Sequence, residues 1–221
     1  VEHATEPGGH GIACHNDDVI IDSCIIDTVK ADYAGIIIGP ASGSTPVSRV
    51  KVNNCKISNA SGTSGYGIHG RYINDCSLTN NNIRLCGRSG IRLLESPRNI
   101  VTGNVTEDNG VYGIEMLDGG VTPTSYNTIV GNIATDTRAV ESKTQDYGIV
   151  QLGTGDYNKV IGNDVSGNVT KGMYGLPQTN DVVRHNTGYI TEISGTATIT
   201  AAAVTVVVTH GLATTPTRVF V

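Results

Sequence analysis

A glycine followed by a hydrophobic residue recurs along the chain at a nearly regular interval. Six Gly-Ile pairs and one Gly-Met pair begin at residues 11, 35, 67, 90, 113, 148 and 172. The successive intervals are 24, 32, 23, 23, 35 and 24 residues. A period of this size is typical of stacked repeats, in which each unit buries its apolar face against the next unit. We therefore expect a solenoid of about seven coils.

A second column of residues keeps the same period. It contains cysteine in the first two repeats and asparagine afterwards: Cys24, Cys55, Asn82, Asn104, Asn132, Asn163 and Asn186. An inward asparagine at a tight turn adopts a positive φ and hydrogen-bonds its equivalents in neighbouring coils, which produces a ladder. A free cysteine at the same place behaves as a small buried hydrophobe. We interpret Cys14, Cys24 and Cys55 as core groups, whereas the pattern does not place Cys76 or Cys86.

The length of one coil indicates its internal structure. Three short strands and three turns fill 23–24 residues, and each strand can pair with its equivalent in the next coil at about 4.8 Å. The predicted fold is an all-β, right-handed parallel β-helix over residues 1–190. The first inward column would contain Ile12, Cys14, Ile36, Ile38, Ile91, Leu93, Ile114, Met116 and Ile149, and the second Ile20, Val50, Val52, Ile100, Ile129, Val160 and Val182. Residues 39–48, 119–126 and 135–146 exceed the period and are expected to project as loops.

The composition supports strands and tight turns rather than an ordinary globular core. The chain has 28 glycines, one Phe and no Trp. The net charge of −5 and the lack of a Lys/Arg-rich run argue against nucleic-acid binding. No apolar stretch approaches the roughly 20 residues that a membrane-spanning helix needs. The five cysteines include no Cys-x-x-Cys pair, so the sequence indicates neither a zinc site nor a disulfide framework.

The Gly-Ile pair followed by an Asn-x-hydrophobe string resembles the parallel β-helix repeats of the pectate-lyase-like superfamily. The strings include VTGNV, IVGNI and VIGND, and the resemblance covers roughly residues 8–190. This superfamily includes pectate lyases, polygalacturonases, nitrous-oxide-accessory-type periplasmic proteins and phage tailspikes. The resemblance implies the fold and an extracellular, cell-surface or virion location, while the repeat itself reports only core packing.

Residues 191–221 depart from the repeat. Thr and apolar residues alternate in this segment, as they do in strands. The string VTHGL…TPTRV resembles small β-rich modules at the ends of viral and phage tailspike-like proteins. We expect this segment to cap the stack or to join subunits of a homo-oligomer, either a trimer or a filament. Because the chain begins at Val1 and stops at Val221 within a strand pattern, we also expect it to be processed or partial.

Outward positions next to the glycine marker form a line along the solenoid. The line contains Ala13, Ile37, His69, Arg92, Glu115, Val150 and Tyr174. Neighbours in this line are expected about 4.8 Å apart, which would join His69, Arg92 and Glu115 in one polar strip. Arginine binds carboxylates, and tyrosine offers an aromatic face with a polar end, so the line could bind sugars. The candidate polysaccharide-binding residues are His69, Arg92, Arg71 and Tyr174. The alternative is a solvated face whose charge pairs each contribute under about 1 kcal/mol.

Hydrolysis of a glycosidic bond uses two carboxyl groups, about 5.5 Å apart for retention and about 6.5–9.5 Å apart for inversion. The candidate catalytic residues are Glu115, Asp118 and Glu95, which lie near the polar strip. Their spacing does not match the Asn-x-Asp…Asp-Asp pattern of polygalacturonases. A pectate lyase would need clustered carboxylates for Ca²⁺, and only Arg92 resembles part of such a site. We therefore expect no cofactor, with Ca²⁺ as the exception if the chain is lyase-like.

Two functions are compatible with these features. The first is an extracellular or virion-surface protein that binds polysaccharide; its enzymatic form would be a tailspike-like depolymerase, either a hydrolase or a lyase. The second is a non-catalytic structural solenoid that assembles into a trimer, fibre or surface layer. The polar strip favours the first function, and the small set of acid–base groups favours the second.

Overall fold

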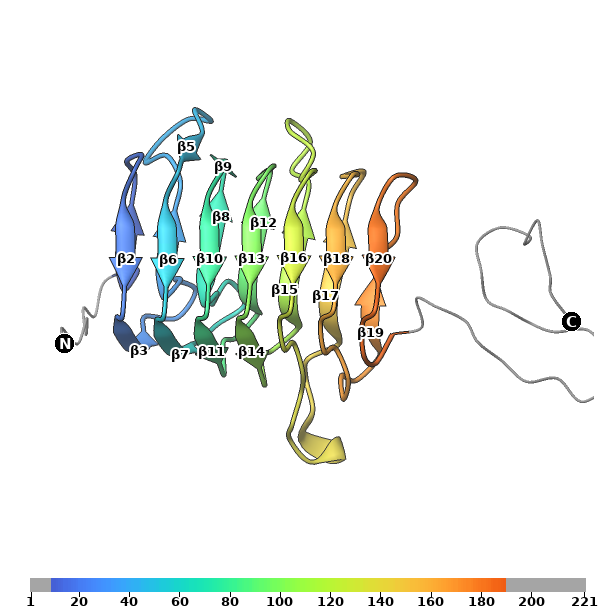
Figure 1. Cartoon of the computed structure of the whole chain (residues 1–221). Coiled ribbons are helices and arrows are strands. Elements are labelled where there is room, and N and C mark those ends of the chain that lie inside the picture. The colour runs from blue at the N-terminus through green and yellow to red at the C-terminus, as the bar shows by residue number, and fades with distance from the viewer. Residues whose placement is uncertain (1–8, 190–221) are drawn as a thin grey trace, which may run out of the picture.

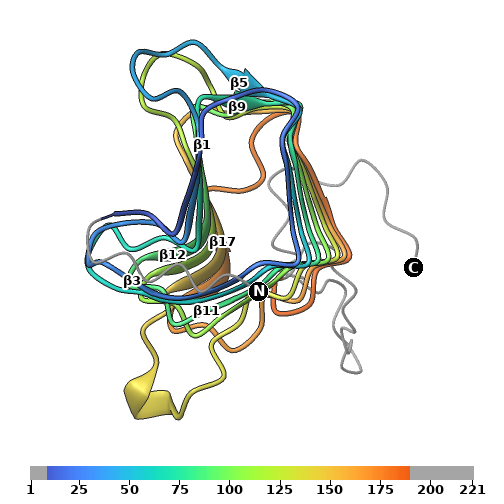
Figure 2. The ribbon, with the colours of Figure 1, turned by 90° about the vertical axis from the view of Figure 1, so that its left-hand side faces the viewer.

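The computed structural model describes residues 9–189, which form a parallel β-helix of seven coils (Figure 1). Viewed along its axis in Figure 2, the successive coils superpose, and the longer loops project from the corners. The predicted all-β solenoid is therefore confirmed. The predicted C-terminal segment, residues 191–221, lies outside the described residues.

Three sheets run along the stack. Sheet A contains the strand next to each glycine marker: β1 (Ile12–Cys14), β4 (Ile36–Ile38), β8 (Ile68–Arg71), β12 (Ser89–Leu94), β15 (Tyr112–Leu117), β17 (Tyr147–Leu152) and β19 (Lys171–Tyr174). Sheet B contains β2 (Ile20–Asp22), β6 (Lys51–Asn53), β10 (Ser77–Thr79), β13 (Ile100–Thr102), β16 (Thr128–Val130), β18 (Lys159–Ile161) and β20 (Val182–Arg184).

Sheet C is shorter and closes the third side. It contains β3 (Ile25–Val29), β7 (Lys56–Ala60), β11 (Asn82–Arg84) and β14 (Val105–Glu107). Single parallel bridges continue it through Val105, Ile133, Asp164 and Thr187. A small two-stranded sheet, β5 (Val47–Ser48) with β9 (Ile73–Asn74), lies between sheets A and B in the second and third coils.

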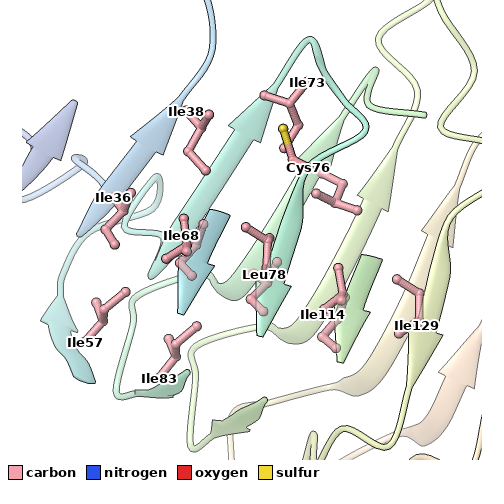
Figure 3. Close-up of a cluster of buried hydrophobic side chains, with 14 of the residues drawn as sticks. Ile36, Ile38, Ile57, Ile68, Ile73, Cys76, Leu78, Ile83, Ile114 and Ile129 are labelled. Carbon is pink, nitrogen blue, oxygen red and sulfur yellow. The ribbon is translucent and has the colours of Figure 1, made fainter. Parts of the chain in front are cut away.

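The predicted inward column of sheet A forms one wall of the core. Its central members have no exposed surface: Ile36, Ile38, Ile91, Leu93, Ile114, Met116 and Ile149. Figure 3 shows Ile36 and Ile114 in the same cluster as Leu78 from sheet B and Ile57 from sheet C. Stacking therefore supplies each coil with the apolar contacts that one coil cannot make alone.

In sheet B, the predicted inward column is wrong by one residue in three coils. The residues Ile20, Ile100 and Val182 lie on the outer face and are 66%, 47% and 38% exposed. Each is followed by a second apolar residue that packs on the core instead: Ile21, Val101 and Val183. The remaining predicted members are buried, namely Val50, Val52, Ile129 and Val160. Because side chains alternate along a strand, a slip of one residue exchanges the two faces.

Close packing between coils explains the glycine marker. A Cβ atom on Gly35 would lie 2.8 Å from the carbonyl oxygen of Gly67, and one on Gly90 would lie 2.8 Å from that of Gly113. The marker glycines 11, 35, 67, 90 and 113 all face the next marker in this way, and none of them has a positive φ. The position therefore requires the absence of a side chain rather than the conformational freedom of glycine.

The predicted asparagine ladder is present, but its member in the third coil is Asn81 rather than Asn82. The buried Asn81 side chain accepts a hydrogen bond from the Cys55 N–H at 3.0 Å and donates one to the Val52 carbonyl at 3.0 Å. Asn82 is exposed on β11. The ladder continues through Asn104, Asn132, Asn163 and Asn186. The Oδ1 atom of each of these residues accepts two hydrogen bonds from the preceding asparagine, one from its backbone N–H and one from its side-chain Nδ2, at 2.9–3.0 Å.

Two further ladders line other corners, and the sequence analysis did not find them. One runs from Cys76 through Asn99, Asn127 and Asn158 to Asp181, and the other from Cys86 through Asn109 and Gln145 to Asn168. In both, the N–H of a cysteine donates to the first asparagine, as Cys55 does to Asn81. Cys76 and Cys86 are therefore core residues, and all five cysteines are free thiols.

The insertions lie outside the stack, as predicted (Figure 1). Residues 118–127 connect β15 to β16, and residues 134–146 contain the 3₁₀ helix η1 (Val140–Ser142). Asp136 anchors the second loop, because its carboxylate accepts hydrogen bonds from the Arg138 guanidinium at 2.6 and 2.9 Å and from the backbone. Burial alone would raise the pKa of Asp136, but these hydrogen bonds hold it well below the usual value. Across residues 9–189, no helix has the length and apolar character needed to cross a membrane.

Candidate functional site

The predicted outward line is present on sheet A. Parallel pairing places Ala13 beside Ile37, Ile37 beside His69, His69 beside Arg92, Arg92 beside Glu115, Glu115 beside Val150, and Val150 beside Tyr174. His69, Arg92 and Glu115 therefore occupy adjacent strands β8, β12 and β15, and we call them the polar strip. The structure differs from the expectation in one respect: this outer face is largely covered by side chains of its own.

Glu115 lies beneath two arginines at one end of the polar strip. It has no exposed surface. Its Oε1 is 3.2 Å from Nη2 of Arg88 and 3.7 Å from Nε of Arg92, and its Oε2 accepts a hydrogen bond from the Ser89 hydroxyl at 2.6 Å. These partners offset the cost of burying the carboxylate. Glu115 thus positions the side chains of Arg88 and Arg92, which are 34% and 14% exposed. The catalytic role predicted for Glu115 stays a prediction.

Tyr66 packs against both other members of the polar strip. The Arg92 guanidinium lies over the Tyr66 ring, 4.9 Å from its centroid, and its Nη1 donates to the tyrosine hydroxyl. The His69 ring lies 4.7 Å from the same ring. Burial, reinforced by the charge of Arg92, lowers the pKa of His69 to about 3, so the imidazole is neutral at physiological pH.

Two nitrogen atoms in this cluster have unused hydrogen-bonding capacity. Within residues 9–189, Nε2 of His69 and Nε of Arg92 are both buried and make no hydrogen bond. Most buried polar groups in proteins are satisfied, so each exception calls for an explanation. Two such atoms on neighbouring strands are consistent with a site whose ligand supplies the missing partners.

Aromatic side chains continue the face toward the C-terminal coils. The rings of Tyr112 and Tyr147 have centroids 6.1 Å apart and are tilted by 32°, and those of Tyr147 and Tyr174 are 5.2 Å apart and tilted by 36°. We call these three residues the tyrosine ladder. Tyr174 is 51% exposed, and Arg88 lies 6.0 Å from the centroid of the Tyr112 ring. The face therefore combines cations in its centre with aromatic rings at one end.

The other predicted residues lie at the opposite ends of the strands. Glu95 is buried and accepts a hydrogen bond from the Val121 N–H at 2.7 Å. Asp118 accepts hydrogen bonds from the N–H groups of Thr124 at 2.7 Å and Thr154 at 2.6 Å. Both carboxylates thus fix residues 118–127 and the neighbouring turn, and their predicted catalytic role stays a prediction.

Arg71 remains accessible at the end of β8. It is exposed, and its guanidinium lies 5.0 Å from the centroid of the Tyr72 ring. Arg71 is in register with Leu94 on the next strand, two residues beyond the Arg92 position. The predicted substrate-binding residues His69, Arg92 and Arg71 therefore belong to two neighbouring strands, whereas Tyr174 lies on β19 at the far end of the sheet.

Sequence reasoning missed Tyr66 and Arg88, which cover the polar strip, and Tyr112 of the tyrosine ladder. Tyr66, Tyr112 and Tyr147 each precede a marker glycine directly, and Arg88 lies two residues before another. The signal was therefore present as a Tyr-Gly pair repeated three times. In the part of the chain that the structure describes, no three His, Cys, Asp or Glu side chains converge on a metal position.

Comparison with known sequences decides the family. The sequence profile of the right-handed β-helix region family matches residues 3–174, with a second match over residues 66–211. The chain belongs to this family. Membership agrees with the stacked parallel sheets and confirms the right-handed β-helix predicted from the repeats. A search of curated protein sequences finds no match.

Solved right-handed β-helix structures resemble the chain at low sequence identity. The Dettilon tailspike protein (gp208) matches with a TM-score of 0.57 at 19% identity, over 71% of this chain and 29% of that one. The periplasmic alginate epimerase AlgG matches with a TM-score of 0.52 at 16% identity, over 80% of this chain and 47% of that one. The A-module of the Azotobacter vinelandii mannuronan C-5 epimerase AlgE4 matches with a TM-score of 0.50 at 16% identity, over 78% of this chain and 56% of that one. The chain thus spans about half or less of these proteins, and the likeness shows a shared fold.

Proposed function

We propose that this right-handed β-helix binds an acidic polysaccharide along the outer face of sheet A. The observation that carries the proposal is a pair of buried nitrogens that make no hydrogen bond, Nε2 of His69 and Nε of Arg92, the second of which has only the Glu115 carboxylate at 3.7 Å. A sugar carboxylate or hydroxyl would supply acceptors for a guanidinium, and a sugar hydroxyl would donate to a neutral imidazole nitrogen. The alginate epimerases and the tailspike that share the fold support this class of ligand as an analogy.

The charge of the face favours an anionic ligand. Arg71, Arg88 and Arg92 contribute three positive charges, and Glu115 offsets only one of them within the cluster. His69 is neutral and adds none. A uronate polymer would place one carboxylate on every sugar, and its attraction to the arginines would weaken as salt increases. We therefore favour a uronate-containing polymer over a neutral one.

A polymer panel tests this proposal. Isothermal titration would compare alginate and polygalacturonate with a neutral β-glucan at low and high salt. We expect binding of an acidic polymer that weakens with salt, and a loss of about tenfold or more in Arg71→Gln and Arg92→Gln, because charge-assisted hydrogen bonds contribute about 1.5–3 kcal/mol. Arg98→Gln is the matched control, since Arg98 is a 51% exposed arginine that pairs with Asp75 at the sheet B corner. No binding of any acidic polymer, or an equal loss in the control, would contradict the proposal.

Depolymerase activity is the enzymatic extension of the proposal. Hydrolysis would release new reducing ends, and a lyase would produce unsaturated uronates that absorb in the ultraviolet. Glu115, Glu95 and Asp118 would have to leave their present hydrogen bonds to act as acid or base. Substitution of these residues in a variant that still binds polymer would therefore show whether they catalyse.

Location and assembly belong to the same proposal. We propose an extracellular, cell-surface or virion protein, because acidic polysaccharides are found at such sites and the fold is shared with a tailspike and a periplasmic enzyme. Assembly into a trimer or filament through residues 191–221 would array several binding faces. Sedimentation of the full chain tests this: a monomer at all concentrations would contradict assembly and leave the binding proposal intact.

A further inference from the structure

We infer that the tyrosine ladder is a second subsite, which stacks on sugar units of the same polymer several units away from the carboxylate held at the polar strip. The inference rests on the proposed function and specifies the ligand: an oligosaccharide of at least about five units, aligned with the solenoid axis. It assigns Tyr147 and Tyr174 a role in affinity for long ligands only.

The spacing of the face supports this alignment. His69, Arg92, Glu115, Val150 and Tyr174 are in register on five consecutive strands of sheet A. Four steps of about 4.8 Å give about 19 Å between the first and last positions. A pyranose unit in an extended chain advances by a distance comparable to one step. A polymer along the axis would therefore present about one sugar to each coil.

The side chains change character along this line. The third and fourth coils present His69, Arg92 and Arg88, which are suited to carboxylates and hydroxyls. At the sixth coil the line holds Val150, which is fully buried, and beyond it lies the exposed Tyr174. Tyr112 and Tyr147 flank this end, and the successive tilts of 32° and 36° prevent full overlap of the three rings. Rings that are partly uncovered can pack against the apolar face of a pyranose.

A second tyrosine pair lies elsewhere in the molecule, next to sheet B, and stacks more closely. Tyr126 and Tyr157 lie two residues before β16 and β18 of sheet B, with centroids 4.9 Å apart and an interplanar angle of 7°. These rings cover one another almost face to face. Tyr157 is 49% exposed, close to the 51% of Tyr174, but it lies away from the polar strip. The chain thus contains a matched control for Tyr174.

Titration with size-graded alginate oligomers tests the inference. We expect Tyr174→Ala to weaken binding of hexamers about three- to tenfold and to leave trimers unchanged, because trimers at the polar strip cannot reach β19. Tyr174→Phe keeps the ring and should bind hexamers like the wild type. Tyr157→Ala should bind both lengths like the wild type.

The possible outcomes separate this inference from the proposed function. If wild-type hexamers bind and Arg92→Gln weakens them, but Tyr174→Ala does not, the tyrosine subsite is refuted and polysaccharide binding stands. Equal losses for trimers and hexamers in Tyr174→Ala would also refute a remote subsite. If neither alginate nor polygalacturonate oligomers bind to the wild type, both proposals fail. Far-UV circular dichroism would verify that each variant retains its β structure.

Discussion

Replacing Asn81 by alanine should destabilise the protein strongly, whereas the same change at the adjacent Asn82 should have little effect. Asn81 is buried in the ladder, and Asn82 is exposed on β11 with no side-chain hydrogen bond described. The two residues have the same chemistry and are neighbours in sequence. The comparison therefore isolates the ladder from the general effect of losing an asparagine.

The expected magnitude follows from the bonds that Asn81 makes. Without its side chain, the buried N–H of Cys55 loses the acceptor that lies at 3.0 Å, which costs about 1–3 kcal/mol. The hydrogen bonds from Nδ2 to the Val52 carbonyl at 3.0 Å and to Oδ1 of Asn104 at 2.9 Å contribute about 0.5–1.5 kcal/mol each. Together, these losses predict that Asn81→Ala lowers the free energy of unfolding by about 2–6 kcal/mol. Asn82→Ala should change it by at most about 0.5 kcal/mol, as expected for an exposed site.

Urea unfolding followed by far-UV circular dichroism measures both values. The comparison is valid if wild type and variants unfold with the same dependence of free energy on urea, because a changed slope would indicate that the coils unfold separately. Similar losses in the two variants would refute the ladder as a source of stability. A larger loss in Asn82→Ala would show that the third coil is shifted by one residue relative to this structure.

Four further outcomes follow from buried groups. The pKa of His69 is about 3 in the folded protein and about 6.5 in the unfolded chain, so unfolding between these pH values takes up a proton. The contribution of the neutral imidazole to the free energy of unfolding is therefore complete above about pH 6.5 and falls by up to about 1.4 kcal/mol per pH unit toward pH 3. His69→Gln should remove this part of the pH dependence when stability is measured by urea unfolding. Burial raises the pKa of Cys86 to about 12 and the pKa values of Cys55 and Cys76 to about 11. A thiol reagent at pH 8 should therefore modify these three cysteines only after denaturation. Rapid reaction of any of them in the native protein would contradict their burial. Glu115→Gln should lower stability by about 2–4 kcal/mol in thermal melts, because the partly buried Arg88 and Arg92 lose the counter-charge of the fully buried Glu115. Gly90→Ala should also destabilise, whereas the same change at Gly9, where a Cβ would meet nothing within 4 Å and φ is not positive, should cost less; equal melting temperatures would contradict the packing explanation.

The repeat made the fold predictable, and the errors occurred where the local sequence was ambiguous. At Ile20-Ile21, Ile100-Val101 and Val182-Val183 two apolar residues are adjacent, so hydrophobicity alone does not say which one faces the core. In the third coil, three consecutive asparagines create the same ambiguity, so the sequence prediction placed the ladder at Asn82 instead of Asn81. The column of sheet A was predictable because each apolar residue there alternates with a different kind of residue in most coils.

The candidate site was predictable in register but not in accessibility. The spacing of the marker glycines placed His69, Arg92 and Glu115 on adjacent strands. It could not show that Tyr66 and Arg88 cover them, because those side chains come from the preceding corner and fold over the strand. The other two ladders had a signal that was overlooked: Cys76 and Asn99, and also Cys86 and Asn109, are separated by one period of 23 residues.

The ladders and the glycine column make a single coil the natural unit of duplication and deletion. Every rung joins equivalent residues in adjacent coils, so cutting the chain at two equivalent positions leaves ends that already superpose. Excision of residues 81–103, for example, would bring Asn104 to the Cys55 N–H and Gly113 beside Gly67, with no new connection to design. Such a chain would be shorter by one rise of about 4.8 Å. The length of any strip of side chains along the solenoid can thus change in whole coils, while the cross-section is preserved.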